Sequence, residues 1–228
     1  MRNVKIGVLG GTFNPIHFGH LHIAKSIQKV FSLSQVQFVV ATTPPHKLPE
    51  ELIPFTHRYA MVSLAVAGTP SFFPSMIELE PQASAFSVDT LQKLACYLYQ
   101  ERADLYFIAG GDSLAEVKTW RQSEKLLTTY NFIFAARPGT DPPNPGDMLP
   151  EKAVARVRNL IGCGRARIRR EVAAETAGEN RIYIVDVSAP DISATRIRAR
   201  VSSGKSIRRM VPKTVCEYID KLHLYGAR

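Results

Sequence analysis

Short apolar runs alternate with helical patterns over the first two-thirds of the chain. Runs that favour buried strands lie at residues 4–9, 36–41, 105–109 and 132–136, with a weaker, proline-interrupted run at 72–80. Patterns typical of helices lie at residues 19–31, 56–67 and 87–100, and shorter ones follow Asp112 and Ser123. Strands and helices that alternate in this way are joined by right-handed crossovers, which place the strands in a parallel sheet. The pattern therefore predicts an α/β fold, a Rossmann-like doubly wound parallel sheet with helices on both faces and the run at 72–80 near an edge.

The last third of the chain shows a less regular pattern. Residues 140–150 are rich in Pro, Gly and Asp, which favours a flexible loop, whereas residues 151–160 have a helical pattern. One more strand is expected at residues 181–187. Two helices are expected at 193–201 and 212–222, the second opened by a proline at its first position. The chain is therefore expected to end in a small helical portion.

Length and composition set the class of protein. The 228 residues suit one domain over 1–228, with an insertion or irregular segment at 140–180 and a C-terminal helical part at 188–228. The chain is 45% hydrophobic and 21% charged, which is typical of a globular protein. No apolar run approaches the roughly 18 residues that span a bilayer, so we expect no membrane partner. Its three cysteines lie far apart and show neither a disulfide framework nor metal-binding spacing, which favours a cytoplasmic location.

Positive charge is concentrated in the C-terminal third. Residues 1–150 hold 12 Lys and Arg against 12 Asp and Glu, whereas residues 151–228 hold 17 against 8 and so carry the whole net charge of +9. Such a segment favours an anionic partner, either nucleic acid, an anionic membrane or a phosphorylated small molecule, although a solvated helix face also explains it. No basic stretch interleaved with aromatic residues occurs there, so we expect no nucleic-acid partner.

A run rich in glycine and histidine follows the first expected strand. It spans residues 10–20 and begins with Gly10 and Gly11, which let a ligand approach the backbone closely. The next helix start offers free N–H groups to an anion, and His17 and His20 can face it from one side. The run lacks the lysine of a P-loop and the spacing of a dinucleotide fingerprint. Half of a metal site, without a convincing third ligand, and purely structural histidines are the alternatives to phosphate binding.

A second candidate anion site follows the last expected strand. Ser193 and Thr195 supply hydroxyls near the N–H groups of a helix start, and Arg196 adds a planar fork of donors that suits phosphate oxygens. The alternative is a capped basic helix. For Arg198 and Arg200 that alternative, solvated charge, is the favoured interpretation.

The runs at residues 10–20 and 192–198 resemble the two signatures of the nucleotidyltransferase superfamily with the His-x-x-His motif, and within it the bacterial nicotinate-nucleotide adenylyltransferases. The resemblance covers most of the chain except about 140–180. It implies that the 5′-phosphate of nicotinate mononucleotide attacks the α-phosphorus of ATP in line, giving deamido-NAD and pyrophosphate in NAD biosynthesis. It also implies that Mg²⁺ is bound through the ATP phosphates, without dedicated protein ligands.

The resemblance also implies roles for individual residues. Charge on the phosphates would be stabilised by His17, His20, Thr195 and Arg196. ATP would be bound by Gly10, Gly11, Thr12, Phe13, Gly110, Asp112 and Ser193. Nicotinate mononucleotide would be bound by Lys47, Ser87, Trp120 and Arg137, with the Trp120 ring stacked on the pyridine and the helix start at Ser87 on its carboxylate.

Each of these roles has a structural alternative. Asp112 and Ser87 could be ordinary helix caps, Trp120 could pack in the core and Lys47 could be a solvated loop residue. Two positions depart from the family pattern, because Phe86 stands where a tyrosine is common and Asn14 where an aspartate is common.

Other functions remain open at this stage. The same chemistry on nicotinamide mononucleotide or another phosphate acceptor is the nearest alternative, and a non-catalytic nucleotide sensor or a nucleic-acid-binding protein is a more distant one. A homo-oligomer is compatible with the sequence.

Overall fold

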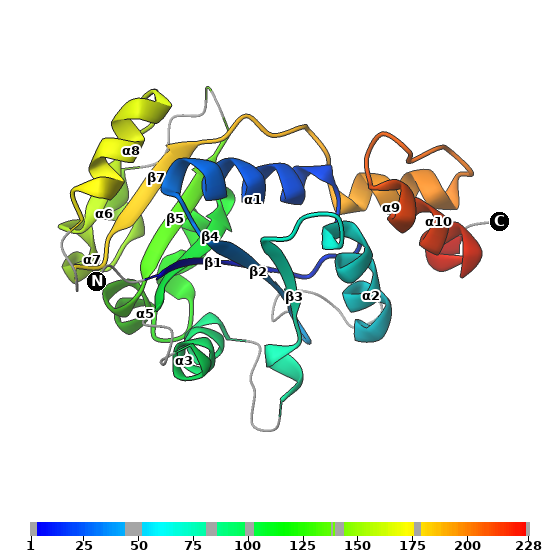
Figure 1. Cartoon of the computed structure of the whole chain (residues 1–228), viewed down its shortest axis with the longest axis horizontal. Coiled ribbons are helices and arrows are strands. Elements are labelled where there is room, and N and C mark those ends of the chain that lie inside the picture. Colours follow the sequence, from blue (N-terminus) through cyan, green and yellow to red (C-terminus); the bar gives the residue numbers. More distant parts are fainter. Residues whose placement is uncertain are drawn as a thin grey trace.

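A seven-stranded parallel sheet forms the centre of the molecule. The computed structural model describes residues 4–43, 52–80, 86–98, 103–137, 139, 144–175 and 179–226. The strands are β1 (Val4–Gly11), β2 (Gln35–Val40), β3 (Phe72–Ser75), β4 (Ala103–Gly110), β5 (Asn131–Ala136), β6 (Val157–Asn159) and β7 (Ile182–Asp186). Their order across the sheet is β3-β2-β1-β4-β5-β7-β6, and every neighbouring pair is parallel (Figure 1). The α/β class and the doubly wound parallel sheet are confirmed.

Helices cover both faces of this sheet. One face is covered by α1 (Phe18–Phe31), α2 (Phe55–Val66) and α8 (Arg165–Ala173), and the other by α3 (Ser87–Tyr97), α4 (Asp112–Glu116), α5 (Ser123–Thr129) and α7 (Glu151–Val154) (Figure 1). Strand β5 is buried along its whole length and sends Ile133 to the first face and Phe132 and Phe134 to the second. Side chains of a strand alternate between faces, so a strand covered by helices on both sides reads as a continuous apolar run.

The C-terminal helical part lies beyond the carboxyl ends of the strands. It contains α9 (Ala194–Ser202), α10 (Lys213–Lys221) and a 3₁₀ turn at Leu224–Gly226. Helix α10 packs on α2, where the His57 ring nitrogen and the Tyr218 hydroxyl are 3.0 Å apart and Thr214 donates to the Leu64 carbonyl at 3.3 Å. This packing brings the end of the chain back to the first strands.

Three local predictions are wrong. The helix predicted at 151–160 stops at Val154, and Val157–Asn159 instead forms edge strand β6 against β7. The loop predicted at 140–150 contains α6 (Pro145–Met148), where the Asn144 side chain accepts the Gly146 N–H at 3.1 Å. The strand predicted at 72–80 ends at Ser75, and a 3₁₀ turn over Ile77–Leu79 follows.

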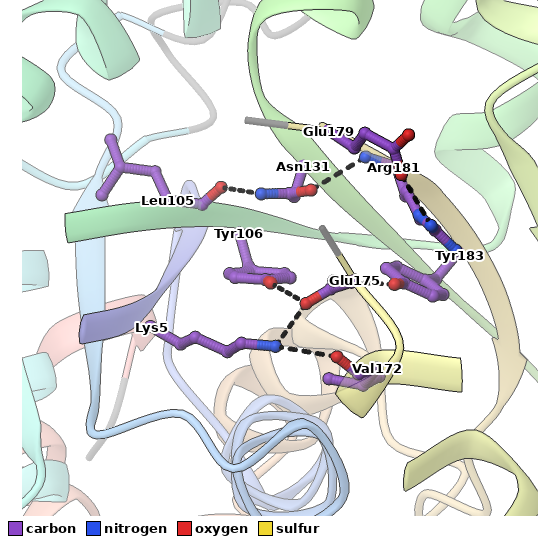
Figure 2. A network of polar contacts seen from close by, with 9 residues as sticks. All are labelled: Lys5, Leu105, Tyr106, Asn131, Val172, Glu175, Glu179, Arg181 and Tyr183. Carbon is purple, nitrogen blue, oxygen red and sulfur yellow. Dashed lines mark hydrogen bonds and ion pairs between the residues drawn. The ribbon is translucent and has the colours of Figure 1, made fainter. Parts of the chain in front are cut away.

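A polar network fastens α8 to the sheet. The Glu175 carboxylate, two residues after α8, accepts hydrogen bonds from the hydroxyls of Tyr106 and Tyr183 and pairs with the Lys5 ammonium (Figure 2). These partners come from three strands, β4, β7 and β1. The segment at 140–180, expected to be irregular, thus contributes an edge strand and a helix that is bonded to the central strands.

The reversal of strand order lies between β1 and β4. The chain runs outward from β1 through β2 to β3, then returns to β4 on the other side. In such sheets ligands bind beside the carboxyl ends of the strands at the reversal. Here those ends carry Gly10–Gly11 and Gly110, since Leu9 is in register with Ile108.

Candidate active site

The turn after β1 is shaped by glycines and by a buried aromatic ring. A Cβ at Gly11 would lie 3.0 Å from the ring of Phe13, and one at Gly10 would lie 3.3 Å from Phe107. Phe13 has a left-handed backbone (φ 47°), and its ring is buried against Phe38 and His20. Strained backbone of this kind is often found at functional sites. Because the Phe13 side chain belongs to the core, only its backbone is available to a nucleotide.

The two histidines sit together at the start of α1. The imidazole rings of His17 and His20 are stacked with centroids 3.7 Å apart. The backbone N–H of His17 donates a hydrogen bond to Nδ1 of His20 at 3.3 Å. A Cβ at Gly19 would approach Nδ1 of His17 to 2.9 Å, so this position requires glycine. The spacing of three residues predicted a common side of the helix start, and the geometry agrees.

His17 is held neutral by its surroundings. Its side chain is 6% exposed, and burial lowers its pKa to about 4. Its Nδ1 has no hydrogen-bond partner within the part of the chain that the structure describes. At neutral pH His17 therefore offers an uncharged imidazole to a ligand rather than a cation.

The late motif folds against the early one. Ser193 caps α9, and its hydroxyl accepts the Arg196 N–H at 3.2 Å. The Arg198 guanidinium donates to the Asn14 carbonyl at 3.0 Å across 184 positions of sequence. The Ile192 carbonyl lies 3.7 Å from where a Cβ of Gly19 would be. The segments at 10–20 and 192–198 thus form one continuous surface, with Thr195 and Arg196 exposed beside the histidines' helix.

Arg198 and Asn14 have a role that the sequence did not indicate. Arg198 was expected to be solvated charge, but its guanidinium joins the two motifs; Arg200 likewise donates to the Ser206 carbonyl at 2.9 Å. The Asn14 side-chain oxygen accepts the hydroxyl of Tyr225 at 2.8 Å. No local pattern predicts contacts between residues this far apart in the chain.

A cavity of about 470 Å³ opens beside the glycine turns at the strand reversal. It is lined by six of the residues predicted from sequence, namely Gly10, Gly11, Thr12, Ser87, Gly110 and Trp120. The Trp120 ring packs edge-on against Phe107 with centroids 6.0 Å apart, and it is half-buried at the cavity wall. Trp120 therefore presents an aromatic surface to a bound ring while its edge is supported by the core.

Glu78 is a cavity residue that sequence analysis missed. Its carboxylate accepts the Thr42 N–H and the Thr90 hydroxyl, both at 3.0 Å. Burial raises the pKa of the Glu78 carboxyl, while these hydrogen bonds oppose the shift. Both oxygens are thus engaged with the protein, which makes Glu78 a support for the cavity wall.

Arg58 is a second missed residue, located behind the glycine turn. Its guanidinium donates to the carbonyls of Thr12, Ala41, Thr42 and Ile53 at 2.6 to 3.2 Å, and the side chain is only 1% exposed. Burial lowers the pKa of this group, and Tyr225 and Glu78 oppose that effect. A buried cation with carbonyl acceptors ties the end of β1 to the end of β2.

The other residues predicted to bind the nucleotide or the acceptor are Asp112, Arg137 and Lys47. Asp112 is exposed at the start of α4 and is not among the described residues that line the cavity, whereas the adjacent Ser113 is. Arg137, after β5, is exposed and paired with Asp191 at 3.3 Å, just before the late motif. Lys47 lies outside the described residues.

Comparisons with known proteins identify the family of the chain. Residues 8–200 match the family described as "Cytidylyltransferase-like". A protein of Thermoanaerobacter sp. (strain X514), called "Probable nicotinate-nucleotide adenylyltransferase", is 36% identical over 224 residues, covering 98% of this chain and 95% of the relative. One of the same name from Syntrophotalea carbinolica is 36% identical over 227 residues, covering 99% of each chain.

Solved structures show a similar fold. The Plasmodium falciparum nicotinic acid mononucleotide adenylyltransferase complexed with NaAD superposes with a TM-score of 0.68 at 17% identity, covering 99% of this chain and 98% of that one. In the described part of this chain, no helix is long and apolar enough to cross a membrane.

Proposed function

The chain belongs to the nicotinate-nucleotide adenylyltransferases within the cytidylyltransferase-like family, and on that premise we propose that it joins nicotinate mononucleotide and ATP into deamido-NAD and pyrophosphate in NAD biosynthesis. The observation that carries the proposal is the contact between the two motifs beside an aromatic-walled cavity, made by Arg198 on the Asn14 carbonyl. A polyphosphate on the motif surface and a pyridine ring in the cavity would then lie next to each other.

The reaction needs positioning more than acid–base chemistry. An oxygen of the acceptor's 5′-phosphate attacks the α-phosphorus of ATP, a new P–O bond forms, and the bond to the β-phosphate's bridging oxygen breaks. The nucleophile is already an anion, so no general base is required. The chain supplies hydrogen bonds from His17, His20 and Thr195, and a positive charge from Arg196, where negative charge accumulates.

ATP binding is assigned to the turns that follow β1 and β4. The backbone of Gly10, Gly11, Thr12 and Phe13 and the hydroxyl of Ser193 surround the phosphates. Gly110 admits the nucleotide, and Asp112 accepts hydrogen bonds from its sugar. Among the described residues, a Cβ at Gly110 would meet no atom within 4 Å, so this edge is open to a ligand, whereas one at the neighbouring Gly111 would lie 2.8 Å from Ala136 on β5.

The acceptor occupies the cavity itself. Its pyridine ring stacks on Trp120, and its carboxylate meets the N–H groups and hydroxyl at Ser87, where α3 begins. Contacts with its phosphate are assigned to Lys47 and Arg137.

Mg²⁺ is proposed to arrive with ATP, bound to the phosphate oxygens, where it neutralises charge on the leaving pyrophosphate. Among the described residues no group of three or more His, Cys, Asp or Glu is arranged to hold a metal ion, and an ion that is carried by the triphosphate needs none. We also propose that the enzyme acts in the cytoplasm as one nucleotidyltransferase domain over residues 1–228.

The test is pyrophosphate release from ATP and Mg²⁺ with separate acceptors. Nicotinate mononucleotide, nicotinamide mononucleotide and phosphopantetheine are assayed in parallel at equal concentration. We expect the nicotinate compound to give the highest kcat/KM. ATP binding without pyrophosphate release from any acceptor would instead identify a nucleotide sensor.

A further inference from the structure

The charge of the cavity is unusual for a site that accepts an anion. Its described lining contains two acidic side chains, Glu78 and Glu116, and a single cationic one, Arg121. Glu78 uses both carboxylate oxygens on Thr42 and Thr90. Whether this cavity accepts a negatively charged ligand therefore depends strongly on Arg121.

Arg121 is held at the cavity mouth by two neighbours. Its guanidinium carbon lies 4.9 Å from the centre of the Phe86 ring, and its Nη1 lies 3.6 Å from the Asp89 carboxylate. Phe86, like Arg121, lines the cavity, and Arg121 directly follows Trp120. A ring face attracts a guanidinium and restricts its orientation without using any of its N–H donors.

The ion pair with Asp89 leaves the guanidinium able to bind a ligand. The Arg121 side chain is 50% exposed and the Asp89 side chain 33%, so water screens their attraction. Arginine carries five N–H donors in a planar fork, and the contact with Asp89 involves only one nitrogen. Donors therefore remain for a carboxylate that enters beside Trp120.

We propose that Arg121 is a specificity-determining residue, which makes the cavity select an aromatic ring bearing a carboxylate over the same ring bearing a carboxamide. This inference rests on the proposed function. A guanidinium binds a carboxylate through charge-assisted, often paired hydrogen bonds, whereas a neutral carboxamide gains no charge attraction and brings N–H donors that face other donors. Phe86, which departs from the family's tyrosine, serves as the platform that holds the guanidinium.

The experiment compares acceptor preference in matched variants. Arg121→Gln removes the charge, Arg121→Lys keeps the charge but loses the fork, and Lys118→Gln removes an exposed cation three positions away that does not line the cavity. For each, kcat/KM is measured with nicotinate and with nicotinamide mononucleotide, along with KM for ATP and Tm.

Arg121→Gln should lower the nicotinate-to-nicotinamide ratio of kcat/KM by about tenfold or more, as expected for a charge-assisted hydrogen bond. The loss should appear in KM for nicotinate mononucleotide, with KM for ATP and Tm unchanged. Arg121→Lys should give an intermediate ratio and Lys118→Gln the wild-type ratio.

The outcomes separate the two proposals. A wild-type enzyme that uses nicotinate mononucleotide, with the same ratio in Arg121→Gln, would overturn the role of Arg121 and leave the proposed function standing. A wild-type protein that turns over neither acceptor would overturn both. If the Tm of Arg121→Gln also fell, the nicotinate-to-nicotinamide ratio of kcat/KM in folded Arg121→Lys would test the proposal instead. An unchanged ratio in Arg121→Lys would contradict the need for the planar fork of donors.

Discussion

Arg58 offers a direct test of how the glycine turn is held in place. Arg58→Met keeps the length of the side chain and removes the charge and all of its donors. Four carbonyls, of Thr12, Ala41, Thr42 and Ile53, then lose a hydrogen bond from the guanidinium.

The magnitude follows from the burial of those carbonyls. All four residues are half-buried, so each lost bond is worth about 1 kcal/mol, the lower part of the range for an unsatisfied acceptor. Roughly 1 kcal/mol is recovered because a cation no longer has to be buried. We expect the free energy of unfolding to fall by about 3 kcal/mol, and Tm by about 6–12 °C for a chain of this size.

Activity should fall beyond what unfolding explains. Thr12 and Ala41 line the cavity, and small displacements of a positioned group reduce turnover by about 10²-fold. Urea unfolding gives the stability, and pyrophosphate release well below the new Tm gives kcat and KM. The matched control is Arg167→Met, at an exposed position in α8. An Arg58→Met protein within 1 kcal/mol of wild type, with normal turnover, would refute the reasoning.

Four further outcomes follow. His20→Ala should reduce kcat by about 10²-fold or more when assayed well below its own Tm, and near-normal turnover there would contradict its role. Burial holds the pKa of His17 at about 4 in the folded protein, against the ordinary value of 6.5 in the unfolded chain. As the pH falls, His17 therefore binds its proton earlier in the unfolded chain than in the folded protein. Stability should therefore decline between pH 6.5 and 4, by on the order of 3 kcal/mol, and His17→Asn should flatten this part of the urea-unfolding profile. Trp120→Leu should raise KM for nicotinate mononucleotide by about 10- to 100-fold while KM for ATP stays constant, as expected for a lost stacking contact. Glu175→Gln should cost about 1–3 kcal/mol in urea unfolding without a change in KM, since the network with Lys5 and two tyrosines lies away from the cavity.

The apolar runs were sufficient to predict most of the sheet. A strand that is covered on both faces must be apolar at nearly every position, so β1, β2, β4 and β5 are visible in the sequence alone. Edge strand β6 was missed because two of its residues are only partly buried and Asn159 is exposed, and its pairing with β7 is made by backbone groups that any sequence carries.

The residues of the candidate site fall into the same two groups, those that a local sequence pattern indicates and those that it does not. Gly10, Gly11, His17 and His20 are recognisable because the turn proposed to bind an anion and the helix start are local structures, built within one short segment. Trp120 and Ser87 were reached through the resemblance to known adenylyltransferases. Arg121 and Glu78 carry no local signal that separates them from surface charge.

Local patterns along the chain specify the alternation of strands and helices and the two turns proposed to bind phosphate, since these depend on side chains a few positions apart. Long-range packing, by contrast, buries Arg58, brings Arg198 to Asn14 across 184 positions and places Arg121 over the Phe86 ring. Whether a cation is solvated or bonded depends on which distant backbone and rings surround it, and packing alone brings those groups together.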